Sequence, residues 1–416
     1  MNQLGSRITY LRKKQGLSQI DLSKKLFLSQ AQISNMEKNR LEISPNLASS
    51  LSYIFNVEKS YFEISPLNLQ LQSLIEDAFE KIFFHKLTTF PFFEKYDDDY
   101  AIDIFQEISI KLLETIYRLR CGNKSEADYL IHNFIIPMKS LILSNLEINS
   151  LSKIYNLFLF EQNNSAHNFN GCLANCDILN SIFTNDDMIG RTKVMKSNVL
   201  YKMGKKVEAF RQIQDAIKFI THLNNDFLLA TAYTCLSAVL ISFKMYSETF
   251  DVLCKLEKLN LDINSNELSA TIYQHRAYIY KTQKDYILAT SNYQLALNEV
   301  TQVNVTNRML ITLLVCQIKS TNTEEASITI KRLRSVDLNL HQSMKLLSLE
   351  CELNLMIGNE TEFGKNIRNV LRYFEKGNYI SDLYYIYSYL MQHYSDQNKY
   401  SKLNEFYKKR EKLNYE

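Results

Sequence analysis

The chain has 416 residues, a formal net charge of +3 and 22% charged residues, which is the balance of a globular protein and excludes a disordered one. At about 100–200 residues per domain, this length predicts several domains, or one domain followed by a repeat array. Nine Gly and four Pro supply little turn chemistry, which favours an all-α fold over a sheet-rich one. The longest apolar stretch, Met309–Ile318, is about half a membrane span, and the N-terminus lacks the apolar region of a signal peptide. We therefore expect a cytoplasmic protein that does not enter a membrane.

The charge is distributed unevenly along the chain. Residues 1–66 contain nine basic and five acidic residues, whereas the other 350 residues contain 39 basic and 40 acidic ones. A small basic head on a neutral body is typical of a nucleic-acid-binding module joined to another function. Pro66 indicates where the head ends. We expect a DNA-binding head over 1–65, a linker helix and loop over 66–97, and a repeat domain over 98–416.

The head is predicted to contain five short helices, at residues 3–15, 19–26, 30–38, 45–55 and 59–62. Ser18 and Ser29 are suited to cap the second and third helices, and Asn39 is suited to the left-handed position after the third. Leu22 and Ile33 belong to the apolar faces of these two helices. Two short helices joined by three residues in a small basic domain form a helix-turn-helix.

Residues 4–62 resemble the phage-repressor (XRE) helix-turn-helix, with Leu17-Ser18-Gln19 before helix two, Ser29 before the recognition helix and Glu37 at its end. The resemblance implies that Arg12 pairs with Glu37 inside the protein. It also implies that Gln19 binds a phosphate, that four residues of the recognition helix face base edges, and that three others contact the DNA backbone. The full predicted DNA-binding set is Gln19, Ser29, Gln30, Ala31, Gln32, Ser34, Asn35, Lys38 and Arg40.

The chemistry of these residues independently suits DNA. Gln and Asn side chains bond adenine in two places, Ala31 suits a thymine methyl group, and Lys and Arg neutralise phosphates. Phe27 stands where the family has Gly in the turn, and a bulky residue at positive φ costs about 1 kcal/mol or more. We therefore expect the turn to differ locally from that of the family. The alternative is a helical domain whose Gln and Lys residues are only solvated surface.

Helical periodicity recurs in pairs after residue 67, and Tyr278–Leu297 resembles a tetratricopeptide (TPR) repeat. A small residue at the point where the two helices of a pair cross recurs at intervals of 37 to 45 residues. The series is Ala127, Cys172, Ala209, Thr249, Ala289, Ala326, Phe363 and Leu403. About eight helix pairs with a period near 40 predict a right-handed TPR-like solenoid, in which each pair buries its open face against the next.

The inner wall of such a solenoid is lined by the first helix of each pair. The positions 18, 15, 11 and 8 residues before each crossing residue are expected to be exposed on this inner wall. The wall is polar and suits an extended peptide. The predicted peptide-binding residues are Arg191, Asn198, Tyr201, Thr231, Thr234, Gln274, Tyr278, Lys281 and Arg308, and later repeats add Lys345, Ser348, Glu352 and Gln392. The alternative is a groove that is merely solvated.

No enzymatic motif is present in the sequence, and we expect no catalytic residue, no metal and no cofactor. The seven His are scattered at about one per repeat. Cys172 and Cys176 share a helix face without a second ligand pair, so they are expected to be core residues and not zinc ligands. The acidic run at residues 96–100 is expected to form a capping loop.

An XRE head followed by a TPR-like body of this length resembles the RNPP family of peptide-pheromone receptors. The resemblance implies a cytosolic quorum-sensing transcription regulator that binds a palindromic operator in double-stranded DNA as a homodimer. It also implies that a short signalling peptide binds in the groove, where Asn198 holds the peptide backbone. Two alternatives remain open. The array is a scaffold that sequesters a protein such as a response regulator, or the chain is a phage-type repressor whose array only oligomerises it.

Overall fold

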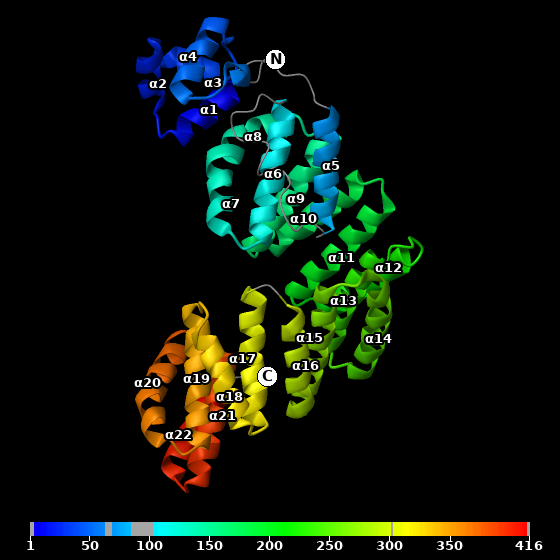
Figure 1. The fold of residues 1–416 in the computed structure, drawn as a ribbon, viewed down its shortest axis with the longest axis vertical. Coiled ribbons are helices and arrows are strands. Elements are labelled where there is room, and N and C mark those ends of the chain that lie inside the picture. The colour runs from blue at the N-terminus through cyan, green and yellow to red at the C-terminus, as the bar shows by residue number, and fades with distance from the viewer. Residues whose placement is uncertain (1–3, 63–68, 85–102, 301–302, 414–416) are drawn as a thin grey trace. The chain divides into compact units, whose positions relative to one another are not determined.

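The computed structural model describes residues 4–62, 69–84, 103–300 and 303–413, and every regular element in these ranges is helical. The all-α prediction is therefore confirmed. The chain divides into two compact units, Met1–Cys235 and Leu236–Glu416. Figure 1 shows the helices of both units in chain order. The predicted domain boundaries near residues 65 and 97, and the acidic run at 96–100, lie outside the described residues.

The head has the five predicted helical segments. They are α1 (Gly5–Lys14), α2 (Gln19–Leu26), α3 (Gln30–Glu37), α4 (Pro45–Phe55) and a 3-10 turn at Lys59–Phe62. Ser18 and Ser29 cap α2 and α3, and the side chain of the third residue of each helix bonds back to its capping residue. Asn39 adopts the left-handed conformation, with φ 56°. These local signals place each helix within two residues of its predicted position.

The core of the head forms where α1, α2 and α3 meet. Ile8, Leu22 and Ile33 are completely buried there. Gly5 allows α1 to approach α3 closely, because a Cβ atom at this position would lie 2.0 Å from the Met36 carbonyl oxygen. A side chain at residue 5 would therefore separate the first helix from the recognition helix.

The turn between α2 and α3 retains the left-handed conformation at Phe27. Its φ and ψ are 55° and 39°, and the Leu28 amide donates to the Ser23 carbonyl oxygen at 3.0 Å. The expectation of a locally different turn is therefore wrong. The Phe27 ring is 95% exposed, so it meets no steric obstacle beyond the backbone strain of about 1 kcal/mol.

After the amphipathic helix α5 (Leu69–Phe83), the described residues contain eight consecutive helix pairs, the number predicted. Most pairs consist of two regular α-helices, and the second helix of the first pair contains a π-helical segment. The pairs are α6 (Ile104–Arg120) with α7 (Lys124–Leu130) and α8 (Ile136–Leu143), α9 (Asn149–Ser165) with α10 (Phe169–Ile182), α11 (Asp186–Lys202) with α12 (Lys206–Ile220), α13 (Asp226–Ser242) with α14 (Tyr246–Ile263), α15 (Asn266–Thr282) with α16 (Tyr286–Glu299), α17 (Val303–Lys319) with α18 (Thr323–Arg334), α19 (Leu340–Met356) with α20 (Glu360–Lys376), and α21 (Ile380–Asp396) with α22 (Tyr400–Glu411).

The lengths of the helices explain why the repeat exceeds the usual 34 residues of a tetratricopeptide unit. The first helix of each pair has 17 residues. The first interval is longer because the second helix of the first pair is longer: α7, a π-helical segment at Ile131–Ile135 and α8 follow one another without a break over residues 124–143.

The crossing residues behave as predicted in most pairs. Six of them have no exposed surface, namely Ala127, Cys172, Ala209, Thr249, Ala289 and Ala326. Phe363 is also buried, with 7% of its surface exposed, although it is large. Leu403 of the last pair is only partly buried. A small side chain at most of the crossings lets the two helices of a pair approach closely.

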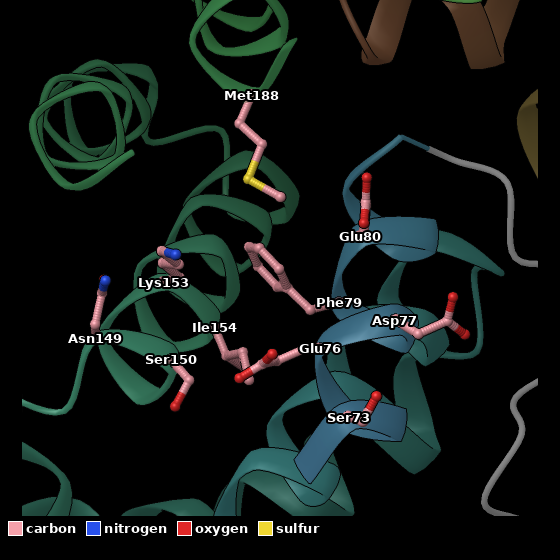
Figure 2. A pocket seen from close by; sticks show the side chains of 10 residues that line it. All are labelled: Ser73, Glu76, Asp77, Phe79, Glu80, Asn149, Ser150, Lys153, Ile154 and Met188. Carbon is pink, nitrogen blue, oxygen red and sulfur yellow. The ribbon is translucent and has the colours of Figure 1, made fainter. Parts of the chain in front are cut away.

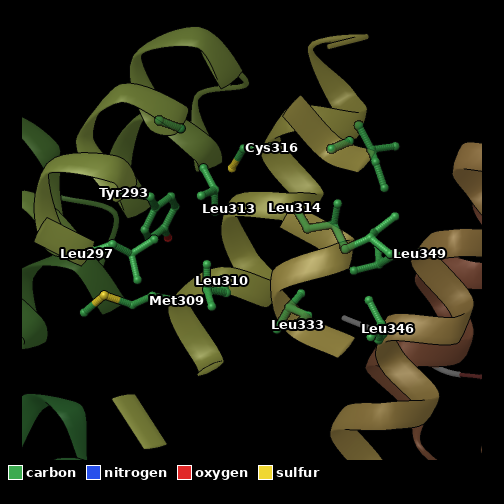
Figure 3. Packing of buried hydrophobic residues seen from close by; sticks show 14 of the residues in the cluster. Tyr293, Leu297, Met309, Leu310, Leu313, Leu314, Cys316, Leu333, Leu346 and Leu349 are labelled. Carbon is green, nitrogen blue, oxygen red and sulfur yellow. The ribbon is translucent and has the colours of Figure 1, made fainter. Parts of the chain in front are cut away.

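The core of the C-terminal unit continues from one pair to the next. Tyr293 and Leu297 of α16 face Leu310 and Leu313 of α17, as Figure 3 shows. The same cluster extends through Leu333 of α18 to α19. Each pair therefore buries apolar surface mainly against its neighbours along the chain, as a repeat array requires.

A buried polar network attaches the head to the first repeat. Arg7 of α1 donates through Nε to Glu107 of α6 at 2.8 Å, and through Nη1 to the Tyr61 carbonyl oxygen at 2.9 Å. The Tyr61 hydroxyl donates to the other oxygen of Glu107 at 2.7 Å. All three residues are at most 5% exposed. Beside them, the rings of Tyr10 and Phe134 meet edge to face at 4.9 Å.

We predict that Glu107→Gln loosens the head. The substitution keeps the shape of the side chain and leaves the buried Arg7 guanidinium without a counter-charge, which costs about 3 kcal/mol or more. Hydrogen exchange of the α1 amides should become faster in the full chain. The control is Glu114→Gln on the same helix, whose more exposed ion pairs contribute less than about 1 kcal/mol. Equal α1 exchange in both variants would contradict the assignment.

Candidate nucleic-acid and peptide interfaces

The recognition helix α3 is held in place by a buried carboxylate. Arg12 donates through Nε to Glu37 at 2.5 Å and through Nη2 at 3.1 Å, so the predicted internal pair is confirmed. Arg12 also donates to the Leu17 carbonyl oxygen at 2.8 Å. The side-chain amide of Gln19 donates through Nε2 to Glu37 at 2.8 Å. One carboxylate thus joins α1, the start of α2 and the end of α3.

Most of the predicted DNA-binding residues are exposed to solvent. Ser34 and Gln19 are partly buried, and the others are exposed: Ser29, Gln30, Ala31, Gln32, Asn35, Lys38 and Arg40. Their exposure on one short helix and the turn after it suits insertion into a major groove. The bond from Gln19 to Glu37 orients the Gln19 amide at the N-terminus of α2, where backbone N–H groups favour an anion.

Gln30 and Gln32 differ in the hydrogen bonds that their side chains make within the protein. The Gln32 carboxamide oxygen accepts from the backbone amide of Ser29 at 2.9 Å, which completes the cap of α3. The Gln30 side chain is exposed and makes no hydrogen bond among the described residues. Gln30 is therefore the better residue with which to test base recognition, because its removal leaves the helix cap intact.

The predicted peptide-binding residues occur on both units. Arg191, Asn198 and Tyr201 lie on α11, and Thr231 and Thr234 lie on the part of α13 that belongs to the N-terminal unit. In the C-terminal unit, the other four lie on α15 (Gln274, Tyr278, Lys281) and α17 (Arg308). Asn198 and Arg308 are exposed, and Thr231, Thr234 and Gln274 are partly buried. The Lys281 ammonium lies 5.6 Å from the centre of the Tyr278 ring.

Arg191 departs from the expected exposed position. It is 8% exposed, and its Nε atom is buried without a hydrogen-bond partner. Burial, together with the nearby charge of Arg120, lowers the pKa of Arg191 to about 10. The neighbouring carboxylate of Glu161 is bonded by Arg120 at 2.6 Å and does not pair with the Arg191 Nε atom. The side chain therefore lies within the unit and not on its surface.

Three of the predicted inner-wall positions meet at one cavity in the C-terminal unit. Lys281, Lys345 and Ser348 line a cavity of about 260 Å³ together with residues of α17, α20 and α21. The spacing rule placed all three on the inner wall. That the Ser348 hydroxyl is buried and unpaired could not be predicted from the sequence, because burial depends on neighbouring helix pairs.

A second cavity, of about 600 Å³, lies in the N-terminal unit between α5 and α9. Figure 2 shows Glu76, Asp77 and Glu80 extending from α5 and Lys153 from α9. Three carboxylates give this surface a negative charge, which repels a phosphate backbone. The cavity contains none of the predicted site residues.

The described residues contain no group of His, Cys, Asp and Glu placed to hold a metal ion. Cys172 and Cys176 are both buried in the N-terminal unit. Burial raises the pKa of Cys176 to about 12, so this thiol is a neutral core residue. In the part of the chain that the structure describes, no helix is long and apolar enough to cross a membrane.

Comparison with known proteins establishes the fold of the chain. Residues 8–62 match the helix-turn-helix family model. Apo RapI is 15% identical, with a TM-score of 0.58, over 83% of this chain and 97% of RapI. A Rap protein complexed with Competence and Sporulation Factor is 11% identical, with the same TM-score and coverage of the two chains. Aspartyl phosphate phosphatase F from Bacillus subtilis is 12% identical, with a TM-score of 0.51, over 84% of this chain and 95% of that protein.

These likenesses confirm the RNPP-type fold expected from the sequence, a helix-turn-helix head followed by a helical repeat array. No curated protein sequence matches the chain. At identities of 11–15%, the similarity concerns the fold alone.

We predict that Gln30→Ala and Lys38→Ala affect DNA binding differently. Gln30→Ala should cost about 1–3 kcal/mol at one base pair and relax specificity there. Lys38→Ala should weaken binding to all sequences alike and reduce the salt slope by about one unit. Fluorescence anisotropy with specific and random duplexes at several salt concentrations measures both effects. If Gln30→Ala weakens both duplexes equally, residue 30 does not face a base.

Proposed function

We propose that the chain is a peptide-responsive transcription regulator, whose head binds operator DNA and whose repeat array binds a short linear peptide. The observation that carries this proposal is that one chain combines an exposed recognition helix with polar inner-wall positions gathered at a cavity. The structure of similar fold that contains Competence and Sporulation Factor supports a binding role for the array. The proposal includes no catalytic role, since the sequence contains no enzymatic motif.

The position of the head supports a role for the array in DNA binding. The network of Arg7, Tyr61 and Glu107 joins α1 to α6 of the first repeat and contains no residue of α3. The exposed residues of the recognition helix, such as Gln30 and Asn35, take no part in it. A head held in this way binds DNA without leaving the array, so a change in the array is transmitted to it.

The exposed recognition helix favours a regulator over a scaffold that only sequesters a protein. A scaffold has no need of the exposed Gln30 and Asn35 on a well-capped third helix. A phage-type repressor whose array only oligomerises would not respond to a peptide. A measured peptide response therefore distinguishes the proposed regulator from such a repressor.

We expect the regulator to bind DNA as a homodimer. One recognition helix reaches a single half-site, so tight binding needs two heads on a palindrome whose half-sites are about one helical turn apart, or a multiple of it. Selection from random duplexes with the full chain should enrich such palindromes, and light scattering should show two chains per duplex. A stable monomer on the selected DNA would contradict the proposal.

We also expect Asn198→Ala to remove the peptide response. Asn198 is exposed on α11, and its carboxamide is suited to pair with both groups of a peptide backbone. Calorimetry with a peptide that binds the wild-type chain should show lost affinity, whereas operator binding without peptide should stay near wild type. The control is Asn180→Ala, which removes an exposed carboxamide from the second helix α10. Undiminished peptide affinity in Asn198→Ala would exclude Asn198 from the site.

A further inference from the structure

The cavity of about 260 Å³ in the C-terminal unit lies between the first helices of four consecutive pairs, α15, α17, α19 and α21. Its wall combines charged, hydroxyl and apolar side chains. Its polar lining includes Lys281, Lys345, Ser348, Asp382 and Tyr385. Since the inner-wall rule selects several of these positions, the cavity belongs to the proposed peptide-binding face.

Lys281 brings a positive charge that nothing in the described residues balances. Its ammonium makes no ion pair there, and its contact is the ring of Tyr278. The nearby thiol of Cys316 is neutral, since burial raises its pKa to about 11. Burial, together with the charge of Lys345, lowers the pKa of Lys281. An anion in the cavity would relieve this unfavourable environment.

The two carboxylates nearby are already engaged. Asp382 binds Lys345 through one oxygen at 3.0 Å and faces His341 through the other at 3.5 Å. Glu352 binds Lys319 at 2.6 Å and accepts from the Tyr385 hydroxyl. The charges cancel within each of the two pairs, Lys345 with Asp382 and Lys319 with Glu352. One positive charge, that of Lys281, therefore remains uncompensated at the cavity wall.

Ser348 gives a second, independent sign of a ligand. The residue is 4% exposed and lines the cavity, and its hydroxyl oxygen is buried without a hydrogen-bond partner. Buried hydroxyl groups in proteins are nearly always bonded. A ligand oxygen in the cavity would accept the hydrogen bond from Ser348.

The floor of the cavity is apolar. Phe374 and Ile386 are at most 1% exposed, and Leu349 is 4% exposed. Ile311 and Val315 of α17 complete this surface. A floor of this kind suits one aliphatic side chain next to the charged group.

We propose that this cavity binds the C-terminal residue of the peptide, with the terminal carboxylate at Lys281 and Ser348 and an aliphatic side chain on the apolar floor. The inference rests on the proposed peptide-receptor function and specifies its ligand. The terminal carboxylate supplies one negative charge, which matches the single surplus cation, and two oxygens, one for each partner.

The test uses three synthetic pools of octapeptides that all end in Leu, with the other seven positions randomised. The first pool lacks acidic residues and has a free terminal carboxylate, and the second is the same pool with a terminal amide. The third pool is amidated and contains Asp and Glu. Mass spectrometry of the peptides that the full chain retains should show about tenfold more retention of the first pool than of either other pool. A tenfold difference in affinity corresponds to about 1.4 kcal/mol of binding free energy.

Three variants test whether the difference in retention between the pools arises at the cavity. Lys281→Met keeps the length of the side chain, removes a charge that burial disfavours, and should reduce retention of the first pool to that of the amide. Ser348→Ala should reduce it about threefold, the loss of one modest hydrogen bond. Lys258→Met removes an exposed lysine of the second helix α14 and should leave retention unchanged.

The outcomes that contradict the inference are distinct from failure of the proposed function. Equal retention of the first and second pools, or full retention by Lys281→Met, would show a peptide receptor that binds its ligand elsewhere. Retention of the third pool that depends on Lys281 would show that a side-chain carboxylate occupies the site and would overturn the terminal assignment. Retention of no pool by the wild-type chain would contradict both proposals.

Discussion

The arrangement of the N-terminal unit depends on one buried charge. Arg7 has 1% of its surface exposed, so its guanidinium needs a counter-charge and hydrogen-bond acceptors inside the protein. Glu107 and Tyr61 supply them, and they come from the first repeat and from the end of the head. Because the network lies on the α1 side of the head, the recognition helix remains exposed. A single constraint therefore fixes the head to the array and leaves its DNA-reading surface accessible.

The repeat array follows from a different constraint, the burial of each helix pair against its neighbours. Small residues such as Ala289 and Ala326 permit close crossings within a pair, and the first helices keep a constant length of 17 residues. First helices of consecutive pairs therefore place equivalent positions side by side. The cavity of Lys281 and Ser348 is a consequence of this regularity, since its polar groups come from inner-wall positions of the first helices of different repeats.

The sequence predicted what depends on neighbouring residues and missed what depends on distant ones. The cap at Ser29 was predictable because its bonds are local. Phe27 was predicted wrongly, because backbone strain of about 1 kcal/mol is smaller than the gain from packing two helices. The pair of Arg7 and Glu107 joins residues 100 positions apart, which no spacing rule reveals. The burial of Arg191 was likewise invisible, since periodicity gives the face of a helix and not what covers that face.

The central claim is that occupation of the array and binding of DNA by the head are coupled within one chain. Coupling between two binding sites is reciprocal, typically about 1–3 kcal/mol. The most direct measurement is the affinity of a bound peptide for the full chain, determined with and without a saturating operator duplex. Our account predicts that DNA changes the peptide affinity about 5–150-fold, and by the same factor by which the peptide changes the operator affinity. A peptide affinity that is identical with and without DNA would contradict it.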